Sequence, residues 1–400
     1  MTPVSNNAAG HEKYSRLRLI SWWDQAKIAR CRLLVIGAGA LGNEILKNAA
    51  LLGFAQVVVV DMDRIEESNL SRAVMFRAED VGGFKAEVAA RAYRSLAPEA
   101  LIHPLVANVI HGCGLGLFQW SDVIVAGLDN REARLWINRS AWKVNRPWVD
   151  GAIEGINGVA RVFLPGAPPC YECTLGEVDW EWLQKRMSCN LLALEPDVGG
   201  KIPTTPTISS IIAGVQVQEA VKLIHGLPAL ASKGFIFEGM NHSSYVVEYT
   251  ANEDCMSHYT LPKIVRLPET SGGLTLEELR RRAQADIGSP VVIEFSRDVV
   301  QKFVCPGCQQ EEELYRPIGS VPYEQARCGK DGHLRTVISV HSYSGETELA
   351  GRALNQLGLP PLDVFTARAG DTEIGYIPYG DAPAVLGRLA TESPVHEVTR

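Results

Sequence analysis

The chain contains 400 residues, of which 46% are hydrophobic and 21% are charged. This length and composition predict a soluble globular protein of two or three domains with an ample core. The formal net charge of -7 and the pI of about 5.8 argue against a nucleic-acid-binding protein, because such proteins usually carry a strongly basic footprint.

The sequence shows no sign of export or of membrane insertion. Its first residues, MTPVSNNAAGHE, lack the apolar core of a secretory signal, and no apolar run approaches the roughly 18 residues of a membrane helix. The nine cysteines therefore indicate metal binding and catalysis rather than disulfides. We expect a cytoplasmic protein with no membrane partner and a disordered N-terminus over residues 1–12.

A buried strand and a glycine turn are predicted from the sequence LLVIGAGALG. Gly37 permits the tight turn, Gly39 allows a phosphate to approach the backbone, and Gly42 lets the following helix pack closely against the strand. A second apolar strand ends at Asp61, whose carboxylate can bind ribose hydroxyls. These features alone fit a nicotinamide dehydrogenase equally well.

A polar and cationic cluster follows the second strand. Asp63, Asn69 and Arg72 belong to the string DMDRIEESNLSR, and Lys85 lies on the next predicted helix. A dinucleotide does not need such a cluster, because helix-end amides hold its pyrophosphate. A triphosphate does need it, because the charge on the transferring phosphoryl group must be neutralised. The cluster therefore favours an ATP site.

These motifs resemble the ThiF/MoeB/ubiquitin-activating superfamily. The resemblance rests on the DMDRIEESNLSR string, on Lys85 and on the later GLDN sequence that begins at Gly127, and it extends over roughly residues 14–260. It is strongest toward the catalytic subunits that activate ubiquitin-like modifiers. It implies an α/β fold over residues 13–262, with a Rossmann-like adenylation domain and a mostly parallel sheet, which binds ATP and Mg²⁺.

The resemblance also assigns roles to two further charged residues. Arg16, on a helix expected over residues 14–30, would reach into the ATP site of the partner in a homodimer, with Arg18 as the alternative. Asp129 follows a buried strand, and ligands of open α/β sheets bind at the carboxyl ends of strands. Asp129 is therefore expected to hold Mg²⁺; it could instead cap the next helix, but Asn130 serves that cap equally well.

The first C-x-x-C pair, Cys170 and Cys173, is ambiguous between a redox pair and half of a zinc site. The resembled family closes a structural zinc site after a later hairpin. At that place this chain has Cys255 and His258. Three thiolates and one imidazole suit tetrahedral zinc.

The resemblance places a thioester-forming cysteine in the loop over residues 176–206. Cys189 is the only cysteine in that interval. Lys185, Arg186 and the start of the next helix are plausible activators, since cationic surroundings lower the pKa of a thiol. The alternative is an inert buried cysteine, as expected for Cys31 and Cys113.

The remaining residues, 263–400, predict a small α+β domain. Helices are expected over residues 274–285, capped by Thr275 with Glu278, and over residues 346–358. A local zinc ribbon is also expected, with His333 preferred over Asp331 as its fourth ligand. The first three ligands would be Cys305, Cys308 and Cys328, although the first two could instead join the earlier C-x-x-C pair.

We expect an activating enzyme that adenylates the C-terminal carboxylate of a ubiquitin-like protein ending in glycine, and then holds it as a thioester on Cys189. The C-terminal domain would recruit a conjugating (E2-like) enzyme. The resemblance extends to the bacterial activating component of Bil/Bub-type conjugation operons linked to phage defence. The alternatives are an activator of a ThiS/MoaD-like sulfur carrier, a non-catalytic scaffold and a dehydrogenase.

Overall fold

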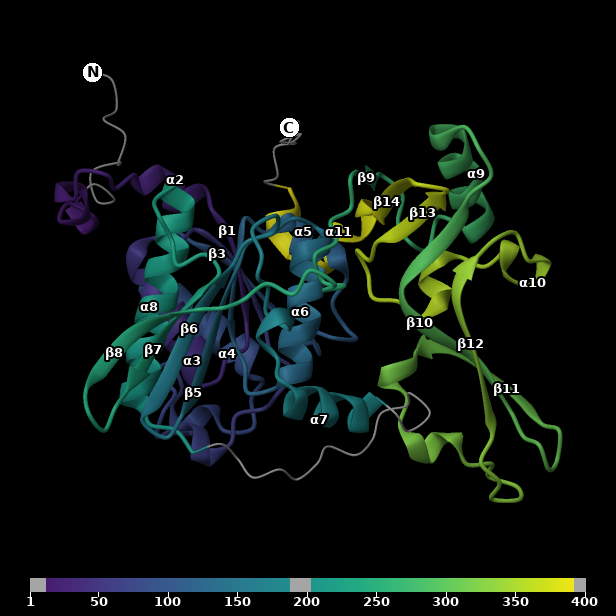
Figure 1. Cartoon of the computed structure of the whole chain (residues 1–400), viewed down its shortest axis with the longest axis horizontal. Coiled ribbons are helices and arrows are strands. Elements are labelled where there is room, and N and C mark those ends of the chain that lie inside the picture. Colours follow the sequence, from purple (N-terminus) through teal and green to yellow (C-terminus); the bar gives the residue numbers. More distant parts are fainter. Residues whose placement is uncertain (1–11, 188–202, 392–400) are drawn as a thin grey trace.

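The computed structural model describes residues 12–187 and 203–391, which form two β-sheets with their helices (Figure 1). The larger sheet has eight strands in the order β3-β2-β1-β4-β5-β6-β7-β8. The first five of these pair in parallel, and the last three pair antiparallel. The strands are β1 Arg32–Ile36, β2 Gln56–Val60, β3 Leu101–Leu105, β4 Val123–Gly127, β5 Trp148–Glu154, β6 Asn157–Phe163, β7 Lys233–Glu238 and β8 Ser243–Glu248.

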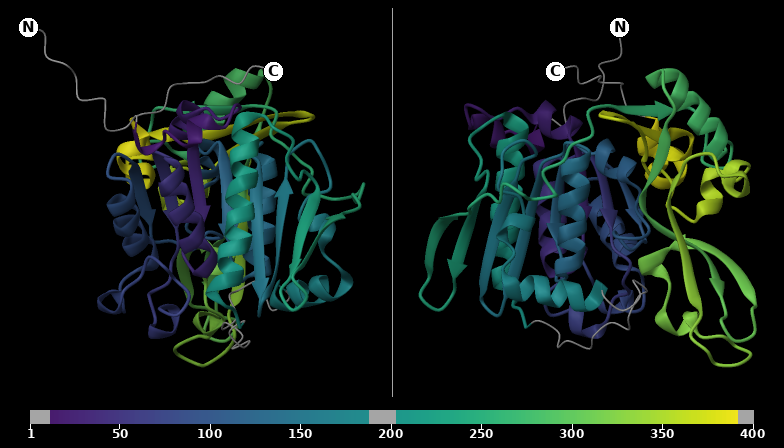
Figure 2. Two further views of the ribbon diagram at one scale, coloured as in Figure 1. Left: turned by 90° about the vertical axis from the view of Figure 1, so that its left-hand side faces the viewer. Right: turned by 45° about the vertical axis from the view of Figure 1, so that its right-hand side comes forward.

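The central strands are apolar throughout because helices cover both faces of the sheet. Leu33 and Val35 of β1 face one core, whereas Leu34 and Ile36 face the other. Helices α3 and α8 lie side by side on the first face, and α6 lies on the second (Figure 2). The helices of this part are α2 Gln25–Arg30, α3 Ala40–Leu52, α4 Lys85–Leu96, α5 Leu115–Trp120, α6 Arg131–Lys143, α7 Glu177–Met187 and α8 Pro206–His225.

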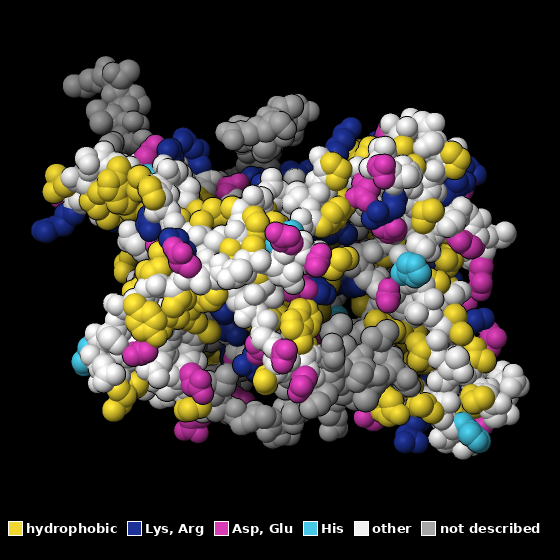
Figure 3. All heavy atoms as spheres, viewed as in Figure 1, with side chains coloured by type: hydrophobic (Ala, Val, Ile, Leu, Met, Phe, Trp, Pro, Cys, Tyr) yellow, Lys and Arg dark blue, Asp and Glu magenta, His cyan; other side chains and the backbone are white. Residues whose placement is uncertain are grey.

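The predicted helix over residues 14–30 is interrupted. A short 3-10 turn occupies Leu17–Leu19, and α2 begins only at Gln25. Asp24 is the N-cap of α2, since its side chain accepts hydrogen bonds from the amides of Ala26 and Lys27. Leu19 of this turn and Trp22, which precedes α2, are exposed. Figure 3 shows hydrophobic side chains gathered over this corner of the molecule.

The second sheet has the strand order β11-β10-β13-β14-β9, and β12 also pairs with β10. Helix α9 begins at Leu276 and carries the expected capping box between Thr275 and Glu278. The helix expected over residues 346–358 is wrong: α10 is a single turn, Ala353 is extended, and a separate 3-10 turn follows at Leu354–Leu357. The elements are β9 Ile264–Leu267, α9 Leu276–Ile287, β10 Val292–Val304, β11 Glu311–Pro317, β12 Thr336–Tyr343, α10 Thr347–Ala350, β13 Phe365–Ala369, β14 Thr372–Pro378 and α11 Ala382–Leu386.

The two sheets are joined through a common hydrophobic core. Leu362 and Leu386 of the C-terminal part pack with Leu115 and Phe118 of α5. The carboxylate of Asp363, which is buried, accepts a hydrogen bond from the amide of Leu115 at 3.1 Å. The C-terminal sheet therefore packs firmly against the larger one. None of the helices within residues 12–187 and 203–391 is long and apolar enough to cross a bilayer.

Candidate active site

A cavity of about 880 Å³ opens at the carboxyl ends of β1, β2 and β4. The chain runs from β1 to β2 on one side and returns to β4 on the other, so this is the topological switch point at which α/β sheets bind ligands. Gly37, Gly39, Asp61, Asp63, Asn69, Arg72, Lys85 and Asp129 all line it. The structure thus brings together eight residues that the sequence assigned to one nucleotide site.

The glycine turn has little room for side chains at two of its positions. Gly37 has a φ of +93°, and a Cβ there would lie 2.5 Å from the carbonyl oxygen of Gly127. A Cβ on Gly42 would lie 1.9 Å from the carbonyl oxygen of Gly37. Gly42 does not line the cavity; it lets α3 start directly behind the turn, so that Gly39, Ala40 and Leu41 at the N-terminal end of this helix line the cavity.

Asp61 ties the end of β2 to the glycine turn. Its Oδ2 accepts a hydrogen bond from the Ala38 amide at 2.7 Å, and its Oδ1 accepts one from the Asp63 amide at 2.8 Å. Burial raises the pKa of Asp61, although these hydrogen bonds and the charge of Lys85 oppose the rise. The carboxylate is thereby fixed on the cavity wall, where a ribose can reach it.

The cationic side chains lie on the wall beyond β2. Lys85 Nζ is 2.8 Å from Asp63 Oδ2, and Arg72 Nη1 donates to the Ser68 carbonyl at 2.7 Å. Asn69 uses its Oδ1 to accept from the Glu66 amide at 2.9 Å, which closes the turn that carries this cluster. The structure therefore places two positive charges on one side of the cavity, as a triphosphate requires.

Asn43 holds this wall in place, although the sequence analysis did not select it. Its fully buried amide donates to the Ala38 carbonyl at 2.7 Å, and its Oδ1 accepts from the Met75 amide at 2.9 Å. It therefore links the glycine turn to the loop that follows Arg72. An asparagine inside the apolar stretch of a helix is the signal that could have revealed it.

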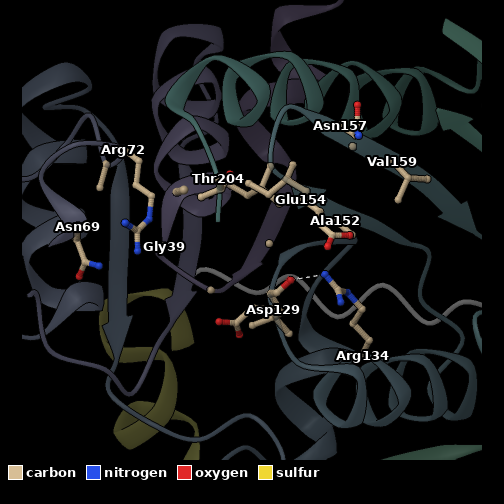
Figure 4. A pocket seen from close by; sticks show the side chains of 18 of the residues that line it. Gly39, Asn69, Arg72, Asp129, Arg134, Ala152, Glu154, Asn157, Val159 and Thr204 are labelled. Atoms are coloured by element: carbon tan, nitrogen blue, oxygen red, sulfur yellow. Dashed lines mark hydrogen bonds between the residues drawn. The ribbon is translucent and has the colours of Figure 1, made fainter. Parts of the chain in front are cut away.

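Asp129 lies opposite the cationic cluster, at the end of β4 (Figure 4). The helix that follows does not use it as a cap, because Asn130 Oδ1 accepts from the amides of Glu132 at 2.8 Å and Ala133 at 3.2 Å. The Asp129 carboxylate is therefore available to a ligand of the cavity, and carboxylate oxygens suit Mg²⁺.

The cavity continues as a groove along β5, β6 and β7. Its wall is formed there by small, polar and apolar residues, and Arg134 of α6 lies between this groove and Asp129 (Figure 4). The sequence analysis did not identify this second half, because its residues carry no motif. The residues of the groove are Ala152, Ile153, Glu154, Asn157, Gly158, Val159, Thr204, Ile236, Phe237 and Glu238.

Four potential metal ligands converge beside α6. The Sγ atoms of Cys170 and Cys173 lie 3.8 Å apart, Cys255 Sγ lies 3.6 Å from that of Cys170, and His258 Nε2 lies 3.3 Å from Cys173 Sγ. Their ligand atoms all lie within 4.8 Å of one another, so the set can hold one metal ion. Three thiolates and an imidazole suit zinc, which would clip the hairpin β7–β8 to the loop after β6.

A second group of ligands lies in the C-terminal part, separate from the first. It joins Cys305, Cys308 and Cys328 to Asp331, not to the preferred His333. The Asp331 oxygens lie 3.3 and 3.4 Å from Cys305 Sγ, because the loop turns sharply between Cys328 and His333 and directs the carboxylate inward. His333 is not part of this ligand group, but it contacts Asp331, with its Nδ1 3.3 Å from Asp331 Oδ1.

Arg16 and Cys189 are the two remaining predicted catalytic residues. Arg16 is exposed on the N-terminal segment and does not line the cavity of its own chain. Cys189 lies outside the described residues. Both remain predictions.

Residues 12–257, more than half of the sequence, match the family model for the ThiF family. The chain belongs to the ThiF family. The archaeal "SAMP-activating enzyme E1" of Haloferax volcanii is 32% identical over 260 residues, a match that covers 63% of this chain and 90% of that relative.

Eukaryotic relatives match over a shorter segment of this ThiF-family chain. The "Nedd8-activating enzyme E1 catalytic subunit" of Drosophila melanogaster is 42% identical over 159 residues, covering 36% of this chain and 35% of the relative. The chain thus spans about a third of the length of these relatives. Among solved structures, Escherichia coli MccB with ATP shares the fold, with a TM-score of 0.51 at 20% identity over 62% of this chain and 74% of MccB.

Proposed function

We propose that this ThiF-family chain is an activating enzyme that adenylates the C-terminal carboxylate of a ubiquitin-like protein. The observation that carries the proposal is the two-part cavity. One half has the glycine turn, Asp61, Arg72 and Lys85, and the other half is a groove that leads away along the sheet. ATP fits the first half, and an extended glycine-ended tail fits the second. The relatives named as activating enzymes support this reading.

In the proposed reaction, a carboxylate oxygen of the modifier attacks the α-phosphorus of ATP. The new O–P bond gives an acyl-adenylate, and the bond to the β-phosphate oxygen breaks to release pyrophosphate. Both reactants are anionic, so Arg72 and Lys85 reduce their repulsion while the turn amides hold the phosphates. Asp129 would hold Mg²⁺, which supplies further neutralisation when it is bound.

Cys189 would then attack the acyl carbon and release AMP, which leaves the modifier as a thioester for a conjugating enzyme. Recruitment of that enzyme is our proposal for the C-terminal domain. We also propose a homodimer that donates Arg16 to the partner's site, supported by the exposed Leu19 and Trp22 near Arg16. We place the protein in a bacterial operon for modifier conjugation and phage defence.

The same cavity would serve the activation of a sulfur carrier, because that reaction begins with the same adenylate. The experiment that tests the proposal is therefore modifier-dependent ATP–pyrophosphate exchange, followed by a search for a thiol-sensitive adduct. Asp129→Ala should abolish exchange, and Cys189→Ala should retain exchange but lose the adduct. Exchange without any adduct in the unaltered protein would favour the sulfur carrier, and retained exchange in Asp129→Ala would contradict the assignment of the site.

A further inference from the structure

A buried ion network lies beneath the junction of the two halves of the cavity. Arg134 Nε lies 2.9 Å from Asp150 Oδ1, and Arg161 Nη2 lies 2.5 Å from Asp150 Oδ2. The side chains of Arg134, Asp150 and Arg161 are only 8%, 0% and 14% exposed. They come from α6, β5 and β6, so three separate elements meet at this point.

The network by itself carries one more positive charge than negative charge. Burial opposes ionisation of Asp150, but the charges of Arg161 and Arg134 outweigh it and lower the pKa of its carboxyl group. The carboxylate is therefore ionised at neutral pH, and two guanidinium groups face one negative charge. Burying such an excess charge is costly unless a further anion compensates for it.

The two arginines differ in what they face. Arg161 is not among the residues that line the cavity: its Nη1 donates to Thr174 Oγ1 at 3.4 Å, and its guanidinium lies 5.0 Å from the Tyr171 ring centre. Arg134 lines the cavity. The excess charge is therefore presented to the cavity by Arg134.

Backbone carbonyls on both sides fix the orientation of Arg134. Its Nη2 donates to the carbonyl of Leu128, the residue before Asp129, and to that of Gly151 at 3.0 Å, where the groove begins. In Figure 4 the guanidinium extends from α6 toward the loop of Asp129, between the phosphate half and the groove. Arg134 therefore lines the cavity beside Asp129, near the place where the groove meets the phosphate half.

We propose that Arg134 binds the terminal carboxylate of the substrate and then the acyl oxygen of the adenylate, and that Asp150 is its positioning residue. The proposal rests on the proposed function and adds a residue to it. A guanidinium donates charge-assisted hydrogen bonds to a carboxylate, and it reduces the repulsion between that carboxylate and the α-phosphate. No proton is transferred: the carboxylate oxygen bonds to phosphorus and pyrophosphate leaves.

The test uses the full chain and two small probes, Mg·ATP and 5′-O-(glycylsulfamoyl)adenosine, which mimics a glycyl-adenylate. Arg134→Gln should weaken binding of the mimic by roughly 10- to 100-fold, while the Kd for Mg·ATP changes by less than about threefold. Arg161→Gln is the matched control, because it removes the other guanidinium from the same carboxylate but not from the cavity. It should change the ratio of the two Kd values by less than Arg134→Gln does, because Arg134 still lines the cavity.

Asp150→Asn should raise the Kd for the mimic relative to the Kd for Mg·ATP, but by less than Arg134→Gln does. If Arg134→Gln fails to fold, Arg134→Lys replaces it in the test. The lysine keeps the positive charge but lacks the planar guanidinium fork, so this variant should also bind the mimic more weakly while its affinity for Mg·ATP changes little. Equal loss of both probes in the Arg134 variants, or the same change of ratio in Arg161→Gln, would show that the network is only structural and would overturn the proposal. If the unaltered protein binds neither probe, the proposed function itself fails.

Discussion

Lys85 is held in the cavity by Asp63, with Nζ 2.8 Å from Oδ2. The two partners differ in exposure: the Lys85 side chain is 14% exposed, whereas that of Asp63 is 54% exposed. Such a pair contributes little net stability when one partner is so well solvated. Its main effect is to keep the ammonium group at the cavity, where it can exchange Asp63 for a phosphate as its ion-pair partner.

The first prediction concerns this ammonium group. Lys85→Met should lower modifier-dependent pyrophosphate exchange by roughly 10²- to 10³-fold, because one positive charge facing the phosphates is lost. Lys47→Met is the matched control, since Lys47 forms a similar ion pair with Glu44 but does not line the cavity. Equal exchange rates in the two variants would show that Lys85 does not contact the reacting phosphates.

The second prediction concerns Asn43, which joins the glycine turn to the loop after Arg72. Asn43→Ala leaves the buried amide of Met75 without its hydrogen bond, which should lower the free energy of unfolding by roughly 1–3 kcal/mol. The Kd for ATP should also rise, because Arg72 is no longer fixed relative to the turn. Urea denaturation and nucleotide titration measure the two effects, and unchanged ATP affinity would contradict this role.

The sequence predicted the phosphate half of the cavity well because local rules determine it. A glycine turn, a strand end and a helix start, which lie close together in the chain, bring Gly37, Asp61 and Lys85 to one cavity. The groove half could not be predicted in the same way. Arg134 and Asp150 meet only because α6 packs beside β5, and neither residue stands in a pattern that predicts this packing.

The C-terminal ligands show a related limit. Spacing alone brought Cys305, Cys308 and Cys328 together, but it could not choose the fourth ligand. That choice depends on the direction of each side chain in a turn only a few residues long. The structure favours Asp331, whereas the sequence analysis preferred His333.

The third prediction separates these two residues. Asp331→Ala should lower the zinc content by one ion per chain, or weaken its retention against a chelator by roughly 10- to 100-fold. His333→Ala should have a smaller effect, because His333 contacts Asp331 and not the thiol cluster. Elemental analysis of both purified variants measures the difference, and the reverse order would restore His333 as the ligand.

The fourth prediction concerns acid stability and the buried Asp150. Burial alone would raise the pKa of its carboxyl group, but the two arginines lower it below its ordinary value of 3.8. A carboxylate whose folded pKa is lower than its unfolded pKa stabilises the protein fully above the unfolded value. That stabilisation is lost as the pH falls below about 3.8 toward the folded pKa.

Asp150→Asn should therefore lower the free energy of unfolding at pH 7 by about 3–5 kcal/mol, since it leaves two buried guanidinium groups without a counter-charge. The difference between the variant and the unaltered protein should shrink as the pH falls below about 3.8, because Asp150 then takes up its proton. Denaturant midpoints across this range measure the effect. Glu248→Gln is the control, because its exposed pair with Lys233 is screened by solvent and should change the midpoint little. A constant difference at every pH would mean that the pKa of Asp150 is the same in the folded and unfolded chains, and that the two arginines do not stabilise its charge.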